Sequence, residues 1–285
     1  MRWTPGSSPD LEDRRGSSGG RGGLRLPGGR MGLGAVVVLL LLSVVFKKDF
    51  LSLLGGGGAV ATETAPAGPL ETTPDEERLK SFIESVLIDA QATWDSLLPA
   101  QVGTPYRHAR LVLFRDAIES ACGLGQAATG PFYCPGDQKV YIDLGFFSDL
   151  HQRFGAPGDF AQAYVLAHEI GHHVQTVLGI DEQVRSLANR DPGQANGLSV
   201  RMELQADCYA GVWGHSAAAQ GKLETGDVEE GMGAAAAVGD DRIEQSSGGR
   251  VNPDGFTHGS ADQRAAWFNR GLSGGKLSAC DTFVR

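Results

Sequence analysis

The sequence lacks an excess of basic residues. Its 285 residues include 25 lysines and arginines against 34 aspartates and glutamates, which gives a net charge of -9. Proteins that bind nucleic acids through the phosphate backbone need a basic face. The composition therefore argues against a nucleic-acid partner, whereas 41% apolar and 7% aromatic residues are ordinary for a globular protein.

The sequence also lacks any pair of cysteines with CxxC spacing, which argues against a cysteine zinc knuckle. Its four cysteines, Cys122, Cys134, Cys208 and Cys280, allow three disulfide pairings. We expect Cys122 to pair with Cys134 across a short loop that contains glycine and proline, and Cys208 with Cys280, which would tie the C-terminus to a helix. Buried free thiols are the alternative, because cysteine packs well as a small apolar residue.

Glycine, in contrast, is abundant and unevenly placed. Fourteen of the 41 glycines lie in the first 58 residues. Residues 1–30 hold six arginines and three acidic residues, and we expect them to form a disordered basic tail. A second glycine-rich stretch, residues 55–73, also contains alanine, threonine and proline, and is typical of a flexible linker.

Between these stretches lies a hydrophobic run. Residues 31–46 are uncharged and almost wholly apolar, and lysines just after them can reach lipid headgroups from a helix end. We predict one transmembrane helix over residues 31–54; a buried core helix is the alternative. Ala59-Val60-Ala61 is similar to a signal-peptidase site, but the 30 residues before the run are long for a cleaved signal, which favours an uncleaved anchor.

The charges that flank this run predict its orientation. Five arginines lie within the 20 residues before it, against two lysines just after it. By the positive-inside rule, the N-terminus would be cytoplasmic and the following domain extracytoplasmic. The expected location is therefore the cell membrane, crossed once.

The folded domain is expected over residues 74–285. Pro74 opens a helical pattern in which Leu79, Phe82, Ile83, Val86 and Leu87 follow i, i+3, i+4 spacing, with acidic residues in the first turn. The expected fold class is α+β, a mostly helical domain with a small sheet. Roughly 210 residues are enough for one substantial core.

The chemistry lies on a predicted helix over residues 160–178. It carries His168, Glu169 and His172, an HExxH motif. Residues i and i+4 share a helix face, so both imidazoles can bind one zinc ion, and Glu169 beside them can act as the general base for a water. The alternative is a core helix with hydrogen-bonded histidines, but two polar rings on so apolar a helix would be costly to bury unpaired. His173 points about 100° away from His172 and is not expected in the site.

A third ligand is available on the next predicted helix, residues 198–220. Glu203 and Asp207 are again spaced i, i+4. We expect Glu203 to bind the metal and Asp207 to accept the far N–H of a liganding histidine, which would set its tautomer. A solvated acidic face is the alternative.

Two further segments resemble parts of a peptidase site. Val140–Leu144 reads as a strand, either an edge strand that binds an extended peptide or an ordinary interior one. His258 precedes a helix that begins near Ser260, and it could donate a hydrogen bond to the oxyanion formed when water adds to a peptide carbonyl. Arg264 could orient His258 or pair with a carboxylate.

HEIGHH at 168–173, ELQAD at 203–207 and THGSADQRAAWF at 257–268 resemble the bacterial neutral zinc metallopeptidase family. The resemblance extends to MRW at the start, EDRRG at 12–16 and the block at 130–147. The order of motifs is also similar to gluzincins, including CAAX-processing and HtpX-like peptidases. One departure is Gly259, since those two groups have proline after the loop histidine.

The resemblance implies zinc bound by His168, His172 and Glu203, with Glu169 as base, Asp207 behind the ligands and His258 as a transition-state donor. We therefore predict a membrane-anchored zinc metallopeptidase that acts on a peptide or protein substrate. A zinc hydrolase of non-peptide amides or esters, and a non-catalytic zinc-stabilised interaction domain, are the alternatives.

Overall fold

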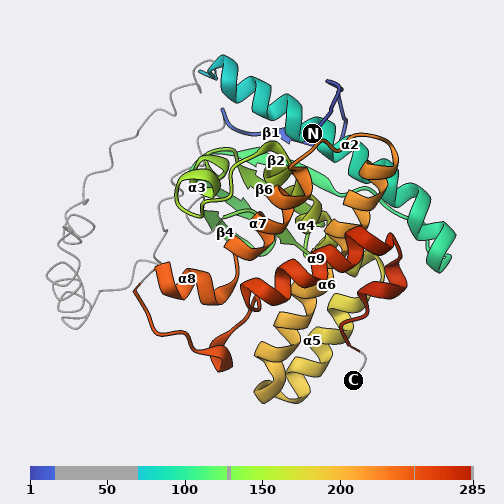
Figure 1. Cartoon of the computed structure of the whole chain (residues 1–285), viewed down its shortest axis with the longest axis vertical. Coiled ribbons are helices and arrows are strands. Elements are labelled where there is room, and N and C mark those ends of the chain that lie inside the picture. Colours follow the sequence, from blue (N-terminus) through green and yellow to red (C-terminus); the bar gives the residue numbers. More distant parts are fainter. Residues whose placement is uncertain (17–69, 127–129, 247, 284–285) are drawn as a thin grey trace, which may run out of the picture. The chain divides into compact units, whose positions relative to one another are not determined.

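The computed structural model describes residues 1–16, 70–126, 130–246 and 248–283, which belong to one compact unit (Figure 1). The fold is mixed, with helices around two small sheets. The strands are β1 (Leu11–Asp13), β2 (Arg110–Phe114), β3 (Ala117–Ser120), β4 (Gly123–Gln126), β5 (Phe132–Cys134) and β6 (Lys139–Asp143). The helices are α2 (Pro74–Val102), α3 (Phe146–Gln152), α4 (Asp159–Val177), α5 (Ile180–Arg190), α6 (Ala195–Ala219), α7 (Asp227–Ala237), α8 (Asp240–Ser246) and α9 (Ala261–Gly274), with short 3-10 turns η3 (Pro192–Gln194), η4 (Pro253–Gly255) and η5 (Leu277–Cys280).

Helix α2 has clear sequence reasons for its ends. The Thr73 hydroxyl accepts a hydrogen bond from the backbone N–H of Glu76, and Pro74 occupies the first turn, where its missing N–H costs nothing. Gly103 ends the helix with φ of 72°, the left-handed conformation that glycine adopts most easily. The predicted helix start at Pro74 is confirmed. The buried face of α2 packs against α4 and α6.

The larger sheet has the strand order β1-β2-β6-β5. β1 and β6 are parallel to β2, whereas β5 runs antiparallel to β6. The middle residues of β2 and β6 are apolar and buried, since both strands lie inside the sheet. Part of one face of the sheet packs with Ile118 of the β3–β4 hairpin. β3 and β4 form a separate hairpin.

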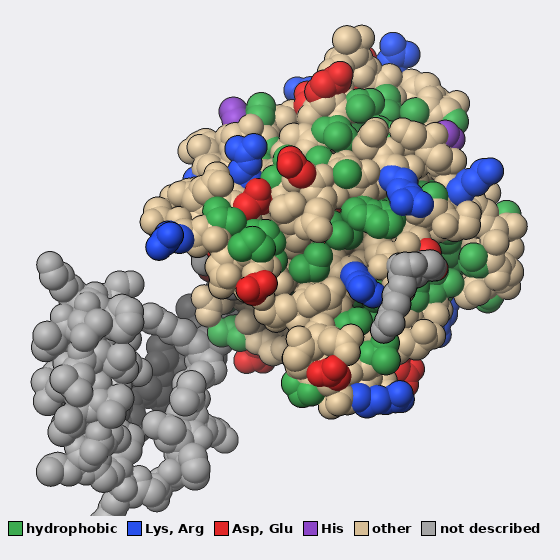
Figure 2. Space-filling model, turned by 60° about the horizontal axis from the view of Figure 1, so that its bottom comes forward, with side chains coloured by type: hydrophobic (Ala, Val, Ile, Leu, Met, Phe, Trp, Pro, Cys, Tyr) green, Lys and Arg blue, Asp and Glu red, His purple; other side chains and the backbone are tan. Residues whose placement is uncertain are grey.

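Five helices pack together at the centre of the described part of the molecule. α4 packs against α2, α6 and α7, and α9 packs against α6 and α7. Gly171 makes the α4–α6 contact possible, since a Cβ atom there would lie 2.9 Å from the carbonyl oxygen of Ala206. On the face shown in Figure 2, acidic and basic side chains are interspersed, with hydrophobic side chains between them.

The prediction of a disordered tail is wrong for residues 1–16. β1 adds to the sheet beside β2, with Leu11 opposite Leu111. The buried Arg15 guanidinium holds the segment through ion pairs to Asp13, Glu76 and Glu77 at 2.7–2.9 Å. Long-range strand pairing and a buried ion-pair cluster therefore order a segment whose composition alone suggested disorder. Residues 17–30 lie outside the described residues.

The predicted membrane topology is also corrected. A single crossing at residues 31–54 would separate the N-terminal residues from the domain by a membrane. The structure instead pairs β1 with β2 in one unit, so both lie on the same side and the predicted cytoplasmic tail with an extracytoplasmic domain is wrong. Among the helices that the structure describes, none is long and apolar enough to cross a membrane. Residues 31–54, and 55–69 of the predicted linker, lie outside the described residues.

Acid is expected to release the N-terminal segment. Burial raises the pKa of Glu12, but hydrogen bonds from Lys139 and Arg110 outweigh burial and lower that pKa to about 2. Hydrogen bonds from Arg15 likewise hold the pKa of Asp13 below its ordinary value. A carboxyl group whose pKa is lowered by folding stabilises the folded form above its unfolded pKa, and loses this contribution as pH falls through its folded pKa. The segment should therefore detach as pH falls from about 4.5 towards 2.

Trp3, which packs edge-on against Phe82 with ring centroids 5.5 Å apart, reports this detachment. The fluorescence difference between wild type and Trp3→Phe should change in that pH window. In Glu12→Gln the change should be smaller, because one of the titrating groups is gone. A Trp3 signal that stays constant until the whole domain unfolds would contradict the prediction.

Candidate metal centre

Helix α4 presents both histidines of the HExxH motif to α6. His168 and His172 are one turn apart, and their Nε2 atoms lie 3.2 Å from each other. Their rings are perpendicular, with an interplanar angle of 90°. Most of the other buried residues of this helix are apolar, so the two imidazole rings are polar groups on a mainly apolar helix.

Glu203 on α6 completes the cluster. Its Oε2 lies 3.2 Å from Nε2 of His168, and its Oε1 lies 3.4 Å from Nε2 of His172. These three residues form a group whose ligand atoms lie within 4.8 Å of one another.

The geometry of the three groups fits a tetrahedral zinc ion. Zinc bonds to imidazole nitrogen and carboxylate oxygen are about 2.0–2.2 Å long, which places tetrahedral ligand atoms about 3.3 Å apart. The observed separations of 3.2–3.4 Å match this value. Two neutral imidazoles and one carboxylate are also a ligand set that zinc hydrolases use.

Asp207 lies behind the ligands, as its spacing from Glu203 predicts. Its fully buried carboxylate is 2.8 Å from Nδ1 of His168, the ring nitrogen that faces away from Glu203. Arg264 donates to both oxygens of Asp207, from Nε at 2.9 Å and from Nη2 at 3.0 Å. The hydroxyl of Tyr164 donates to the same carboxylate. Asp207 is thus hydrogen-bonded in a way that sets the orientation of His168.

These contacts also explain the charges of the site. Burial raises the pKa of Asp207, but the Arg264 guanidinium outweighs it and holds the pKa below its ordinary value. Burial lowers the pKa of His168, but the Asp207 carboxylate outweighs it and raises that pKa to about 10. Burial raises the pKa of Glu169, which makes this carboxylate a better proton acceptor.

The other histidines of the motif region have separate partners. Nδ1 of His172 lies 2.9 Å from the side-chain oxygen of Gln175, and Nε2 of Gln175 donates to the carbonyl oxygen of Met202. His173 lies outside the cluster: its Nε2 is 2.6 Å from the carbonyl oxygen of Arg107, and its Nδ1 is 3.1 Å from the hydroxyl of Tyr133. His172 is therefore oriented towards the metal site, while His173 joins α4 to its neighbours.

A cleft runs past these residues and is lined mostly by apolar groups. His168, Glu169, His172 and Glu203 lie along it, and so does His258 from the loop before α9. The cleft lining also includes the apolar side chains of Phe146, Phe154 and Val165, and the polar side chains of Thr176 and Asp181.

The strand beside this cleft is β5. The strand predicted at Val140–Leu144 corresponds to β6, which is interior because it pairs with both β2 and β5. The interpretation of that strand as an edge is therefore wrong. β5 occupies the edge of the sheet, and Phe132 and Tyr133 of β5 line the cleft.

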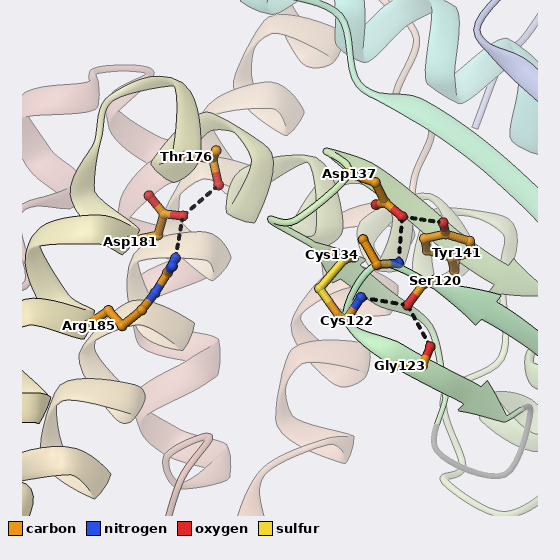
Figure 3. The surroundings of a disulfide bond; sticks show 10 residues. Ser120, Cys122, Gly123, Cys134, Asp137, Tyr141, Thr176, Asp181 and Arg185 are labelled. Carbon is orange, nitrogen blue, oxygen red and sulfur yellow. Dashed lines mark hydrogen bonds and ion pairs between the residues drawn. A yellow bond between two sulfur atoms is a disulfide. The ribbon is translucent and has the colours of Figure 1, made fainter. Parts of the chain in front are cut away.

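A disulfide joins β5 to the β3–β4 hairpin, opposite Thr176 and Asp181 (Figure 3). Cys134 pairs with Cys122, and the nearby Asp137 carboxylate accepts hydrogen bonds from Ala121 N–H and Tyr141 hydroxyl. The second disulfide joins Cys208 of α6 to Cys280 near the C-terminus. Both predicted pairings are present.

His258 is half exposed and lines the cleft. The predicted orientation of His258 by Arg264 is not what the structure shows. The partner of His258 is Asp240 at the start of α8, whose carboxylate lies 3.0 Å from Nδ1 of His258. Arg264 instead pairs with Asp207, the second of the two possibilities that the sequence left open.

Three residues of this region were not predicted from the sequence. Tyr164 and Gln175 are one helical turn from His168 and His172 respectively, so the i, i+4 and i, i+3 spacing could have identified them. Asp240 is 18 residues from His258, and no local pattern connects the two.

The comparisons with known proteins agree with this geometry. The family model described as "Putative neutral zinc metallopeptidase" matches residues 1–283. The uncharacterized protein YpfJ of Escherichia coli K12 is 46% identical over 289 residues, 99% of each chain. The uncharacterized protein Rv2575 of Mycobacterium tuberculosis is 44% identical over 203 residues, 67% of this chain and 66% of the relative. No solved structure matches. With the family model covering almost the whole chain, the protein belongs to the putative neutral zinc metallopeptidase family.

Proposed function

We propose that the protein is a zinc-dependent peptidase with its active site at His168, His172 and Glu203. The observation that carries the proposal is the convergence of these three side chains at 3.2–3.4 Å, next to Glu169, in one cleft. The family membership supports the same reaction class.

Each residue has a role that follows from its position. His168, His172 and Glu203 would hold the ion, and Asp207 and Gln175 would keep the imidazoles oriented. Zinc, when bound, supplies a Lewis acid that polarises a carbonyl group and makes water more acidic. Glu169 would accept the proton of the attacking water and pass it to the leaving amine. His258 would donate a hydrogen bond to the oxyanion.

Two features support a peptide as the substrate. β5 is an edge strand that borders the cleft, so its backbone can pair with an extended chain by strand addition. The cleft lining also includes Phe146, Phe154 and Val165, which offer an apolar surface for a side chain of the substrate.

The test combines metal analysis with a peptide-library digest of the full chain. We expect one equivalent of zinc, cleavage that disappears when a chelator removes the zinc, and cleavage that returns when zinc is added back. His172→Ala should lose both zinc and cleavage. Binding of one equivalent of zinc without hydrolysis of any substrate would favour the non-catalytic domain. Hydrolysis of non-peptide amides or esters, without cleavage of peptides, would favour the non-peptide hydrolase. Either result would overturn the proposal.

A further inference from the structure

We propose that Asp240 is a positioning residue for the reaction, which holds the loop of His258 and directs one ring nitrogen into the cleft. The inference rests on the proposed function, because it assumes that His258 assists the peptidase reaction. Asp240 lies at the first residue of α8, and its side chain is 13% exposed, whereas that of His258 is 51% exposed. A largely buried carboxylate thus supports an accessible histidine.

The Asp240 carboxylate binds the loop at four points. One oxygen, Oδ2, accepts hydrogen bonds from three successive backbone N–H groups, those of Thr257 and His258 at 2.7 Å and that of Gly259 at 3.1 Å. The other oxygen, Oδ1, lies 3.0 Å from Nδ1 of His258. The backbone N–H of Asp240 also donates to the carbonyl of Gly259 at 2.9 Å. One side chain therefore fixes both the backbone of the loop and its imidazole ring.

Gly259 shows why this loop cannot have the His-Pro sequence of the CAAX-processing and HtpX-like peptidases, whose order of motifs is similar. Its φ is +92°, a conformation that proline cannot adopt because the ring holds φ near about −65°. Its N–H is also one of the three that Asp240 accepts, and proline has no N–H. The His-Gly sequence is therefore a requirement of the loop that Asp240 holds.

The contact at Nδ1 determines what the other nitrogen can do. A carboxylate is only an acceptor, so Nδ1 must carry a proton when it bonds to Asp240. Thr257 Oγ1, 3.1 Å from Nδ1, is the other polar atom near this nitrogen and can also accept. Nε2 is then left for the cleft, and in the doubly protonated ring it can donate to an oxyanion while Nδ1 remains bound to Asp240. The other charged groups that line this cleft are Glu169, Asp181, Glu203 and Arg264.

The first test uses no enzymatic activity. In ¹⁵N NMR spectra of zinc-loaded, full-length protein with labelled histidine, the His258 signals are assigned from their loss in His258→Ala. We expect Nδ1 to be the protonated nitrogen in wild type. Asp240→Asn keeps one acceptor oxygen for the three backbone N–H groups but presents an NH₂ group to the ring, so the proton should move to Nε2. An unchanged protonation pattern in this variant would overturn the proposal, even if no peptide is cleaved.

The second test asks whether Asp240 acts through His258. Removing a donor to an oxyanion typically lowers kcat by about 10²–10³-fold, and we expect this range for His258→Ala. Asp240→Ala should lower kcat by about 10–100-fold and change KM by less than about threefold. The reason is that His258 would contact the oxyanion of the transition state and not the bound substrate. In the His258→Ala background, Asp240→Ala should have no further effect. A further loss of tenfold or more in that background would show an independent role and contradict the proposal.

Asp241 provides a matched control. It is the neighbouring residue, and its carboxylate accepts the backbone N–H of Ala261 at 2.7 Å. Asp241→Asn removes the same charge one position along, so kcat and the His258 tautomer should stay as in wild type. If Asp241→Asn moved the tautomer as much as Asp240→Asn, loss of a nearby charge would explain both variants and the assignment to Asp240 would fail.

Discussion

Glu169→Gln is expected to lower kcat for peptide cleavage by about 10³-fold, within the range that general acid–base catalysis contributes. Glutamine has nearly the same shape but cannot accept a proton from water. Because Glu169 is next to the three proposed ligands and is not one of them, the variant should still bind one equivalent of zinc. Zinc content and steady-state kinetics on one cleaved peptide measure both effects.

Glu182→Gln is the control for this substitution. Glu182 is an exposed residue of α5, and its replacement changes the net charge by the same amount outside the cleft. The kcat of this variant should stay within about twofold of the wild-type kcat, because substitutions at exposed positions usually have small effects. Glu169→Gln with kcat near wild type would mean that another group accepts the proton. Loss of zinc from that variant would mean that Glu169 is itself needed for metal binding.

Asp207→Asn is expected to destabilise the metal-free domain by about 3–5 kcal/mol, the usual cost of removing one partner of a buried ion pair. Asp207 is completely buried, and Arg264 is 4% exposed. The variant leaves the buried guanidinium with only the more distant carboxylate of Glu203, 3.7 Å from Nη2. Tyr164 also loses its charged acceptor. Urea unfolding in the presence of a chelator measures the change without a contribution from lost zinc.

Two further variants make this result specific. Asp207→Asn combined with Arg264→Met removes both charges, so it should recover part of the lost stability. Asp149→Asn breaks an ion pair with Arg153 whose partners are 45% and 67% exposed, and it should cost less than about 1 kcal/mol. A loss below about 1 kcal/mol for Asp207→Asn itself would mean that water or another group replaces the carboxylate, and that the buried pair contributes little net stability.

Apart from the disulfide between Cys208 and Cys280, most contacts that could be predicted from the sequence lie within one or two helical turns. The spacing of His168 and His172 implies a shared helix face, and the structure places their Nε2 atoms 3.2 Å apart. Thr73 and Pro74 mark a helix start, as Ser260 does for α9 through a capping box. In each case the hydrogen bonds join residues at most four apart, so the local pattern contains both partners.

Several contacts between distant segments were decided only by the tertiary structure. Composition predicted a disordered tail, but Leu11 pairs with Leu111, 100 residues along the chain. The strand pattern at Val140–Leu144 fits an edge or an interior strand equally well, and only its pairing with both β2 and β5 shows that it is interior. Asp240, whose carboxylate lies 3.0 Å from Nδ1 of His258, is 18 residues away at the start of α8.

The sequence by itself thus determined which residues could form the proposed metal site: two imidazoles, the adjacent glutamate and an acidic pair on a later helix. The tertiary structure decided which strand borders the cleft, which residues orient the ligands, and that the first 16 residues belong to the domain. The physical reason is that side-chain periodicity encodes which face of an element is buried, whereas the partner of that face depends on how the chain closes over long distances.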